Sequence, residues 1–173
     1  MRRIAFVMLA LALAGCSDDG DETSPDTTDP PSAAADFSFR PVLEVRAADD
    51  CGAGDADHLR DVDDETCYEL GPPPVERVTF ESAEAGLDPA GTTWIVNPVL
   101  TDDETGIDAL NELADPCFVQ GPTCPTGQVA MVLDGEVLTA PTIQDTDFAP
   151  DRVIITGDFT QEEAEDLADR LSP

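Results

Sequence analysis

The alternation of apolar and polar residues is clearest in the last third of the chain. Residues 129–133 and 137–143 are mainly apolar runs on either side of Asp134 and Gly135. An Asp-Gly pair tolerates the positive φ angles of a two-residue type I′ turn, so the pattern predicts an antiparallel β-hairpin. Pro141 has no backbone donor, which places the second run at a sheet edge or a strand end.

A further strand and an amphipathic helix are predicted after this hairpin. Residues 153–155 are a β-branched run closed by Thr156 and Gly157. Thr160 then precedes Glu163 by three residues, which is the spacing of a helix capping box. Four apolar residues follow at the spacing of one helical face, namely Ala164, Leu167, Ala168 and Leu171. We therefore expect a helix that packs one apolar stripe against a sheet.

The preceding part of the chain favours strands and one more helix. Strands are predicted over residues 39–45, 75–82 and 92–100. Residues 68–74 end in three prolines and predict an extended connector. Thr101 and Glu104 have the spacing of a second capping box, followed by an apolar helical stripe at Ile107, Leu110 and Ala114. The sum predicts an α+β domain, a small mixed or antiparallel sheet with two helices packed on one face.

The amino terminus has the pattern of a secretory signal. Arg2 and Arg3 precede an apolar run over residues 4–14, which is too short to span about 30 Å of hydrocarbon. Residues 13–16 read Leu-Ala-Gly-Cys and resemble the lipobox of bacterial lipoproteins. We expect residues 1–15 to be removed and Cys16 to be lipidated, which anchors the protein at the extracytoplasmic face of the cell membrane. The alternative is an ordinary signal peptide with a chance cysteine.

Composition separates a linker from one globular domain. Residues 17–36 are almost free of large apolar side chains and cannot bury a core. We interpret residues 16–36 as the lipidated cysteine and a disordered acidic tether, and residues 37–173 as a single domain.

Charge excludes one class of partner. The chain has 38 acidic residues, eight arginines and no lysine, for a formal net charge of −30. Such a surface repels phosphate groups, so binding of nucleic acid is not expected. Two explanations of the charge remain open: solubility in the surrounding medium, or recognition of a basic partner.

Four cysteines remain besides Cys16, and they favour disulfides outside the cytoplasm. Local pairing of Cys51 with Cys67 and of Cys117 with Cys124 is the simplest of three connectivities. A zinc site that includes His58 is the alternative, but no Cys-x-x-Cys pair is present.

No motif in the sequence points to catalysis. The carboxylates of residues 55–65 lack the order of a calcium loop, and no metal or cofactor is expected. His58 is the only histidine and has no serine or free thiol arranged around it in sequence. No glycine-rich phosphate loop is present either. We therefore expect a protein that is not an enzyme and has no catalytic residues.

The carboxyl-terminal motifs resemble those of one known module. Residues 134–135, 140–141, 155–160 and 163–168 are similar to the Asp-Gly, Ala-Pro, Ile-Thr-Gly-x-Phe-Thr and Glu-Ala-x-x-Leu-Ala motifs of the SecD periplasmic head subdomain. Residues 39–42, 70–72 and 94–96 resemble landmarks of actinobacterial SecD. The transmembrane helices of SecD and its base subdomain have no counterpart in this sequence.

The resemblance implies a SecD head-like lipoprotein that binds secreted polypeptides or components of the Sec translocon. The alternative is that the fold has been reused for envelope structure or for binding a small ligand. The residues assigned to the motif and to a possible binding edge are Asp134, Gly135, Ala140, Pro141, Thr156, Gly157, Phe159 and Thr160.

Overall fold

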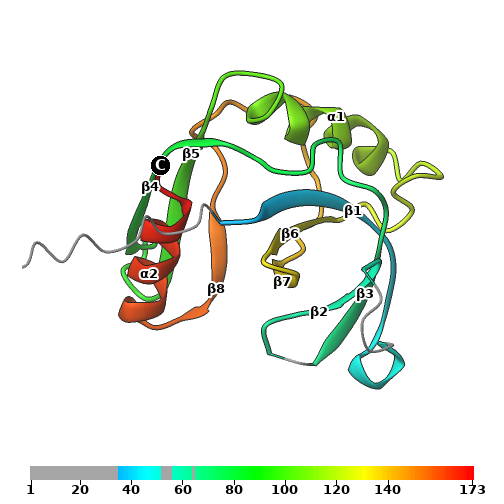
Figure 1. Ribbon diagram of the computed structural model, residues 1–173, viewed down its shortest axis with the longest axis horizontal. Helices are drawn as coiled ribbons and strands as arrows, with labels where there is room; N and C mark the ends of the chain where they lie inside the picture. The colour runs from blue at the N-terminus through cyan, green and yellow to red at the C-terminus, as the bar shows by residue number, and fades with distance from the viewer. Residues whose placement is uncertain (1–34, 52–55, 64) are drawn as a thin grey trace, which may run out of the picture. The chain divides into compact units, whose positions relative to one another are not determined.

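The computed structural model describes residues 35–51, 56–63 and 65–173 (Figure 1). Cys16, the expected signal peptide and nearly all of the expected tether lie outside the described residues. The elements are β1 (Phe37–Ala47), η1 (Ala48–Asp50), β2 (His58–Arg60), β3 (Thr66–Leu70), β4 (Phe80–Leu87), β5 (Trp94–Leu100), α1 (Ile107–Phe118), β6 (Val129–Leu133), β7 (Glu136–Thr139), β8 (Ile155–Phe159) and α2 (Gln161–Leu171).

Five strands form a curled antiparallel sheet in the order β2-β3-β1-β6-β7. Its two edge strands, β2 and β7, approach each other. Asp61, just after β2, forms a parallel bridge with Val137 of β7. The backbone N–H of Val62 donates to the carbonyl of Val137 at 3.2 Å. A small apolar cluster is buried within this sheet, made of Val42, Leu70, Ala130, Val132 and Val137.

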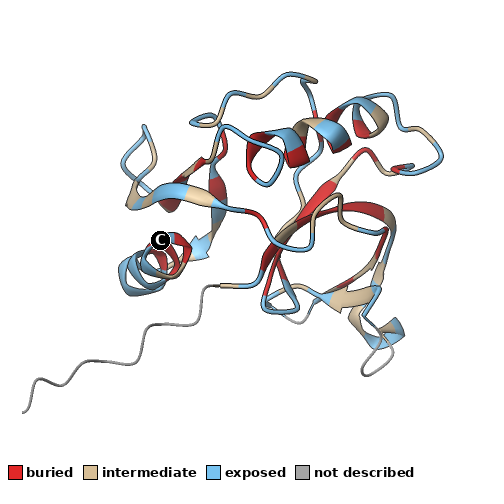
Figure 2. Ribbon diagram, turned by 45° about the horizontal axis from the view of Figure 1, so that its top comes forward, coloured by how far each residue is buried: buried red, intermediate tan, exposed pale blue. Residues whose placement is uncertain are grey.

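The other three strands form a second antiparallel sheet in the order β4-β5-β8, against which α2 packs. Helix α1 packs against β1. Both helices have buried as well as exposed positions (Figure 2). Their buried residues, including Leu110 of α1 and Leu167 of α2, belong to one larger apolar cluster. This cluster joins the two sheets into one core.

Strand β1 links the parts of the domain because it pairs with two partners in succession. Its first half pairs with β6 from Phe37 to Pro41, and its second half pairs with β3 from Val42 to Ala47. The ring of Phe37 lies edge-on to Phe80, with ring centroids 5.1 Å apart. Because such aromatic pairs add to area burial, this contact stabilises the packing of the first strand against β4.

The carboxyl-terminal elements confirm the local predictions most closely. Asp134 and Gly135 have φ angles of 50° and 88°, the positive values that a type I′ turn requires. Helix α2 has the predicted capping box: Thr160 Oγ1 accepts from the N–H of Glu163 at 3.3 Å, and Glu163 Oε2 accepts from the N–H of Thr160 at 2.8 Å. The α+β class is confirmed as well.

Strand boundaries were predicted less well. β7 ends at Thr139, although residues 140–143 continue beside β6 through bonds such as Val129 N–H to the carbonyl of Pro141. The strand expected over residues 75–82 is β4, which begins at Phe80, and the one expected over 153–155 is β8, which begins at Ile155. Residues 66–70, placed partly in a connector, form β3. The strands also form two sheets where one was expected.

The second capping box is wrong. Helix α1 begins at Ile107 after Gly106, and no side chain caps it. Asp103 instead accepts from the N–H groups of Thr105 at 2.8 Å and Gly106 at 3.0 Å, and the carbonyl of Thr101 accepts from Ile107. A Cβ on Gly106 would lie 1.9 Å from the carbonyl oxygen of Thr101, so this tight turn requires glycine. The turn therefore displaces the start of the helix.

The structure joins Cys51 to Cys67 and Cys117 to Cys124, with Cα–Cα distances of 5.5 and 4.8 Å. These are the two local pairings that the sequence analysis gave as the simplest connectivity. The first bridge fastens the end of η1 to β3, and the second closes the segment that follows α1.

Candidate binding grooves beside strand β7

The segment of residues 138–143, expected from the sequence at a sheet edge or a strand end, contributes lining to two grooves. Leu138 lines one of them, and Pro141, Thr142 and Ile143 line the other. The groove lined by Leu138 has a volume of about 290 Å³, and the other has a volume of about 400 Å³. We call the larger one the apolar groove and the smaller one the acidic groove.

The apolar groove is lined by α1, β6 and the loop that precedes β8. Its apolar lining includes Leu110, Val129, Met131, Ile143, Phe148 and Val153. Asp145 and Arg152 supply its charged groups. Ile154 also lines this groove and is 48% exposed, so an apolar side chain faces solvent there.

Helix α1 holds the loop wall of the apolar groove through Asn111. The backbone N–H of Phe148 donates to Asn111 Oδ1 at 2.9 Å, and Asn111 Nδ2 donates to the carbonyl of Phe148 at 3.1 Å. This reciprocal pair satisfies both backbone groups of one loop residue. It fixes the half-buried Phe148 ring against the apolar cluster.

The acidic groove lies between the hairpin of β6 and β7 on one side and β8 with α2 on the other. Leu133, Leu138, Phe159 and Leu167 provide apolar lining, together with Val62. Five charged residues also line it: Asp63, Asp158, Glu163, Asp166 and Arg170. It therefore combines an apolar floor with a predominantly negative rim.

Two of these charged groups are held by neighbours. The guanidinium of Arg170 contacts the carboxylate of Asp134 and lies 4.0 Å from Asp166. The carboxylate of Glu163 accepts from the backbone N–H of Thr160, which with the Thr160 hydroxyl holds the pKa of Glu163 below its usual value. Glu163 thus stays ionised at neutral pH, while Arg170 is already paired.

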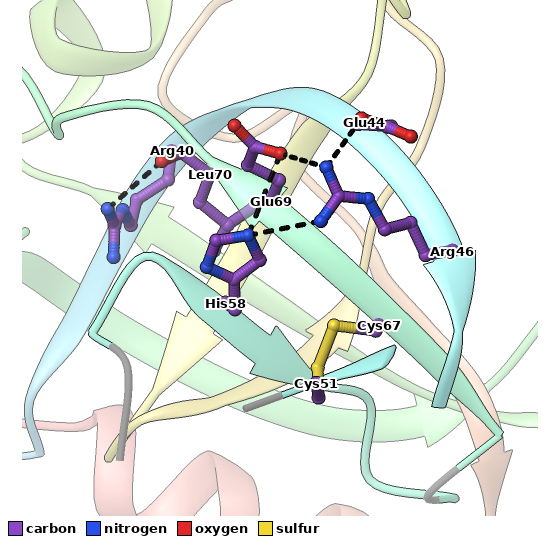
Figure 3. A network of polar contacts seen from close by, with 8 residues as sticks. All are labelled: Arg40, Glu44, Arg46, Cys51, His58, Cys67, Glu69 and Leu70. Carbon is purple, nitrogen blue, oxygen red and sulfur yellow. Dashed lines mark hydrogen bonds and ion pairs between the residues drawn. A yellow bond between two sulfur atoms is a disulfide. The ribbon is translucent and has the colours of Figure 1, made fainter. Parts of the chain in front are cut away.

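A separate polar network connects β1, β2 and β3 (Figure 3). Arg46 donates to both Glu44 and Glu69 at 2.7 Å, and His58 Nε2 lies 3.6 Å from Glu69. The hydrogen bond from Arg46 lowers the pKa of Glu44. His58, the only histidine of the chain, belongs to this network and lines neither groove.

Arg40 is the buried cation of the same region. Its guanidinium donates to the carbonyls of Gly71 at 2.8 Å and Ala56 at 2.7 Å, and to the carboxylate of Asp57 at 2.7 Å. The residue is only 9% exposed. Because a buried charge is costly unless it is paired and hydrogen-bonded, these contacts are what allow Arg40 to lie there.

The motif residues expected from the sequence are divided between structural and groove positions. Asp134 and Gly135 form the hairpin turn, and Thr160 caps α2. Pro141 lines the apolar groove, while Gly157 and Phe159 line the acidic groove. Ala140 and Thr156 line neither of these two grooves.

The edge of β7 is partly occupied. The carbonyl of Val137 already accepts from Val62, so a strand added along the whole of β7 would have to displace that contact.

The residues that sequence reasoning missed are those of the loop before β8, above all Phe148 and Arg152. The run of three apolar residues, Val153, Ile154 and Ile155, is a sequence signal for this groove, because an extended chain points alternate side chains to opposite sides, and Ile154 is the one exposed in the structure.

Sequence and structure comparisons give the affiliation of this domain. Residues 59–172 match the family model described as SecDF, P1 head subdomain. The chain belongs to the SecDF P1 head family. Among curated proteins, none shows a significant match to this sequence.

Two solved structures share the SecDF P1 head fold of this chain. One is described as the crystal structure of SecDF in super-membrane-facing form, with 24% identity, a TM-score of 0.55, and coverage of 81% of this chain and 19% of that chain. The other is described as the structure and function of a membrane component SecDF that enhances protein export, with 23% identity, a TM-score of 0.55, and coverage of 81% and 63%. This chain therefore spans less than two thirds of either solved chain.

Two further observations concern the described part of the chain. None of its helices combines the length and the apolar character needed to cross a membrane. Within residues 35–51, 56–63 and 65–173, no group of three or more His, Cys, Asp or Glu side chains is arranged to hold a metal ion.

Proposed function

We propose that this protein is a membrane-tethered, non-enzymatic module that binds polypeptides outside the cytoplasm, either secreted chains or components of the export machinery. The single observation that carries the proposal is the segment of residues 138–143, which lines two apolar-floored grooves on a SecDF P1 head fold. Grooves of this kind accept apolar side chains of an extended peptide, while the neighbouring backbone offers hydrogen bonds. One of the similar solved proteins is described as enhancing protein export, which supports this class of partner.

The proposal includes anchoring through Cys16. The apolar run before it is too short to span a bilayer, and two acyl chains suffice for stable attachment because each buried methylene contributes about 0.8 kcal/mol. Replacing Cys16 by serine should shift the protein from the membrane fraction to the soluble fraction after cell lysis. Unchanged partitioning would contradict the lipid anchor and leave the groove proposal to be tested separately.

Photo-crosslinking tests polypeptide binding directly. A photoreactive residue at Leu138 or Thr142 places the probe in the acidic or the apolar groove, respectively. Leu87 is the matched control, because it is 50% exposed on β4 and lines neither groove. We expect crosslinks in living cells to secreted or Sec-type proteins from the two groove positions and not from Leu87. Equal labelling from all three positions would contradict the proposal.

The apolar groove also favours a second candidate function, the binding of a small apolar ligand. Its volume of about 400 Å³ lies in the range of small-molecule sites, and Asp145 and Arg152 could orient a polar group. An organic extract of the purified protein, analysed by mass spectrometry, distinguishes the two functions. A single stoichiometric small molecule that blocks the Thr142 crosslink would favour this alternative.

A further inference from the structure

The acidic groove differs from the apolar groove in charge and not in the character of its floor. Asp63, Asp158, Glu163 and Asp166 line it together with Arg170, which gives a formal charge of 1 − 4 = −3. The apolar groove is lined by Asp145 and Arg152, for a charge of 1 − 1 = 0. Two grooves that share one segment of chain therefore offer different electrostatic environments.

The positive charge of Arg170 is already engaged by two carboxylates. Its guanidinium already contacts Asp134, which belongs to the hairpin, and it lies near Asp166 on its own helix. Asp63, Asp158 and Asp166, which line the groove, are all exposed. A partner that enters the groove thus meets exposed carboxylates beside an apolar floor, and any compensating cation has to come from the partner.

We propose that the acidic groove binds polypeptide segments in which a large apolar side chain is flanked by lysine or arginine. This inference rests on the proposed function, because it names the class of segment that the same surface would take. Leu133, Leu138, Phe159 and Leu167 provide the contact for the apolar side chain. Asp63, Asp158 and Asp166 provide the charge complementarity for its neighbours.

The charge of the whole chain acts in the same direction. With a net charge of −30 and no lysine, the protein attracts basic segments over distances comparable to the Debye length, about 8 Å at physiological salt. The chain has eight arginines against 38 acidic residues, so positive groups offset only a small part of this negative field. The groove then selects those basic segments that also carry an apolar side chain.

Binding of short fluorescent peptides to the full chain, purified in a non-denaturing detergent, tests the inference. One peptide has a central leucine flanked by lysines, the second has glutamates in place of the lysines, and the third has serine in place of the leucine. We expect the first to bind about tenfold more tightly than the second, since two nearby charge pairs at a wet surface each contribute roughly a factor of three. We also expect it to bind more tightly than the third, because serine cannot replace the apolar contact of leucine. Its affinity should fall as salt rises.

Two sets of variants locate the binding. The pair Asp158→Asn and Asp166→Asn should weaken binding of the lysine peptide about tenfold, roughly the contribution of two charge pairs. Glu81→Gln with Glu84→Gln is the control, since it makes the same change in net charge on β4 and outside the groove. Arg170→Gln should tighten binding several-fold, because it leaves Asp134 and Asp166 without their cation. Thermal midpoints of all variants show whether each is folded.

The outcomes separate this inference from the proposed function. Equal weakening by the groove pair and the β4 pair would mean that only net charge matters, and would overturn the groove assignment. Equal binding of the lysine and glutamate peptides, with crosslinks at Thr142 retained, would overturn the charge preference while the proposed function stands. Absence of binding by every peptide, together with absence of crosslinks, would overturn both.

Discussion

The guanidinium of Arg170, in the last turn of α2, contacts the carboxylate of Asp134 in the turn between β6 and β7. The pair joins the helix of the three-stranded sheet to the hairpin of the five-stranded sheet. Asp134 also accepts from the backbone N–H of Asp36, at the start of the described domain, at 3.1 Å. One side chain therefore connects three segments that are far apart in the sequence.

A double-mutant cycle measures how much this pair contributes. Arg170→Gln, Asp134→Asn and the double variant should give a coupling energy below about 1 kcal/mol, because both groups are substantially exposed. Asparagine is chosen because it tolerates the positive φ of residue 134. Urea unfolding at low and high salt provides the measurement. A coupling that does not shrink at high salt would show that the contact is not mainly electrostatic.

The hairpin turn should depend on the backbone freedom of Gly135. Gly135 has a φ of 88°, and a Cβ placed there would meet nothing within 4 Å, so only backbone strain opposes Gly135→Ala. We expect a loss of about 1 kcal/mol in unfolding free energy. Gly86→Ala is the matched control, because Gly86 also has open space but lies in β4 without a positive φ. Equal effects of the two substitutions would contradict the type I′ turn.

Arg40 should not be replaceable by lysine. Its guanidinium donates through three different nitrogens to four acceptors, the carbonyls of Gly71, Ala56 and Leu70 and the carboxylate of Asp57, and an ammonium group cannot reach all of them. Arg40→Lys should lower the unfolding free energy by about 2–3 kcal/mol, since buried acceptors lose charge-assisted hydrogen bonds. Arg77→Lys serves as the control, because Arg77 is half exposed and lies 3.9 Å from Asp36. A loss below about 0.5 kcal/mol is expected there.

The disulfide that closes the longer loop should contribute somewhat more to stability, because the entropy of loop closure rises with the logarithm of loop length. Cys51 and Cys67 are 16 residues apart, and Cys117 and Cys124 are 7 apart. The loop-entropy relation gives about 3 kcal/mol for the first bridge and about 2.4 kcal/mol for the second. Paired cysteine-to-alanine variants, unfolded under oxidising and reducing conditions, provide the measurement. Reduction should lower the unfolding free energy of the parent chain more than that of either variant, because the parent has two bridges to lose and each variant has one. A loss in the parent no larger than in either variant would show that the bridges are not formed in solution.

The turn before α1 should make a pH-dependent contribution. Hydrogen bonds from the Thr105 and Thr101 hydroxyls and from backbone N–H groups hold the pKa of Asp103 below its usual value. A carboxyl group whose pKa is lowered in the folded state stabilises the fold at pH values above its ordinary pKa, near 3.9. This stabilisation is lost as the pH falls through the folded-state pKa. Asp103→Ala should therefore be destabilising at pH 7, and the difference from the parent should narrow below about pH 4.

The neighbouring Asp102 provides the control for this pH experiment. It takes no part in the hydrogen bonds that Asp103 accepts. Asp102→Ala removes the same charge from the same exposed turn, so it reports the general effect of lowering net charge. A pH profile for Asp103→Ala that runs parallel to that of Asp102→Ala would contradict a specific role of Asp103.

Residues close in sequence were sufficient to predict the hairpin, the capped helix α2 and the local cysteine pairing that the structure shows. In each case the signal and the structure that it causes lie within a few residues, as with Asp134 and Gly135 or with Thr160 and Glu163. The same reasoning failed at α1, because Asp103 and Gly106 formed a competing tight turn, in which the Thr101 hydroxyl donates to Asp103. The N–H of Thr101 donates to the carbonyl of Thr79, so neither group of Thr101 takes part in a capping box. β3 was missed because its short alternation runs directly into three prolines.

The division into two sheets, the closure of β2 against β7 and both grooves could be seen only in the folded chain. Val62 donates to the carbonyl of Val137, and Leu138, Phe159 and Leu167 line the acidic groove together, although these residues come from segments tens of positions apart in the sequence. No local pattern specifies which apolar runs pair, since many pairings would bury a similar area. Amino-acid order alone was enough for the family, the negative charge and the local elements, whereas the groove that combines carboxylates with an apolar floor arises from long-range packing.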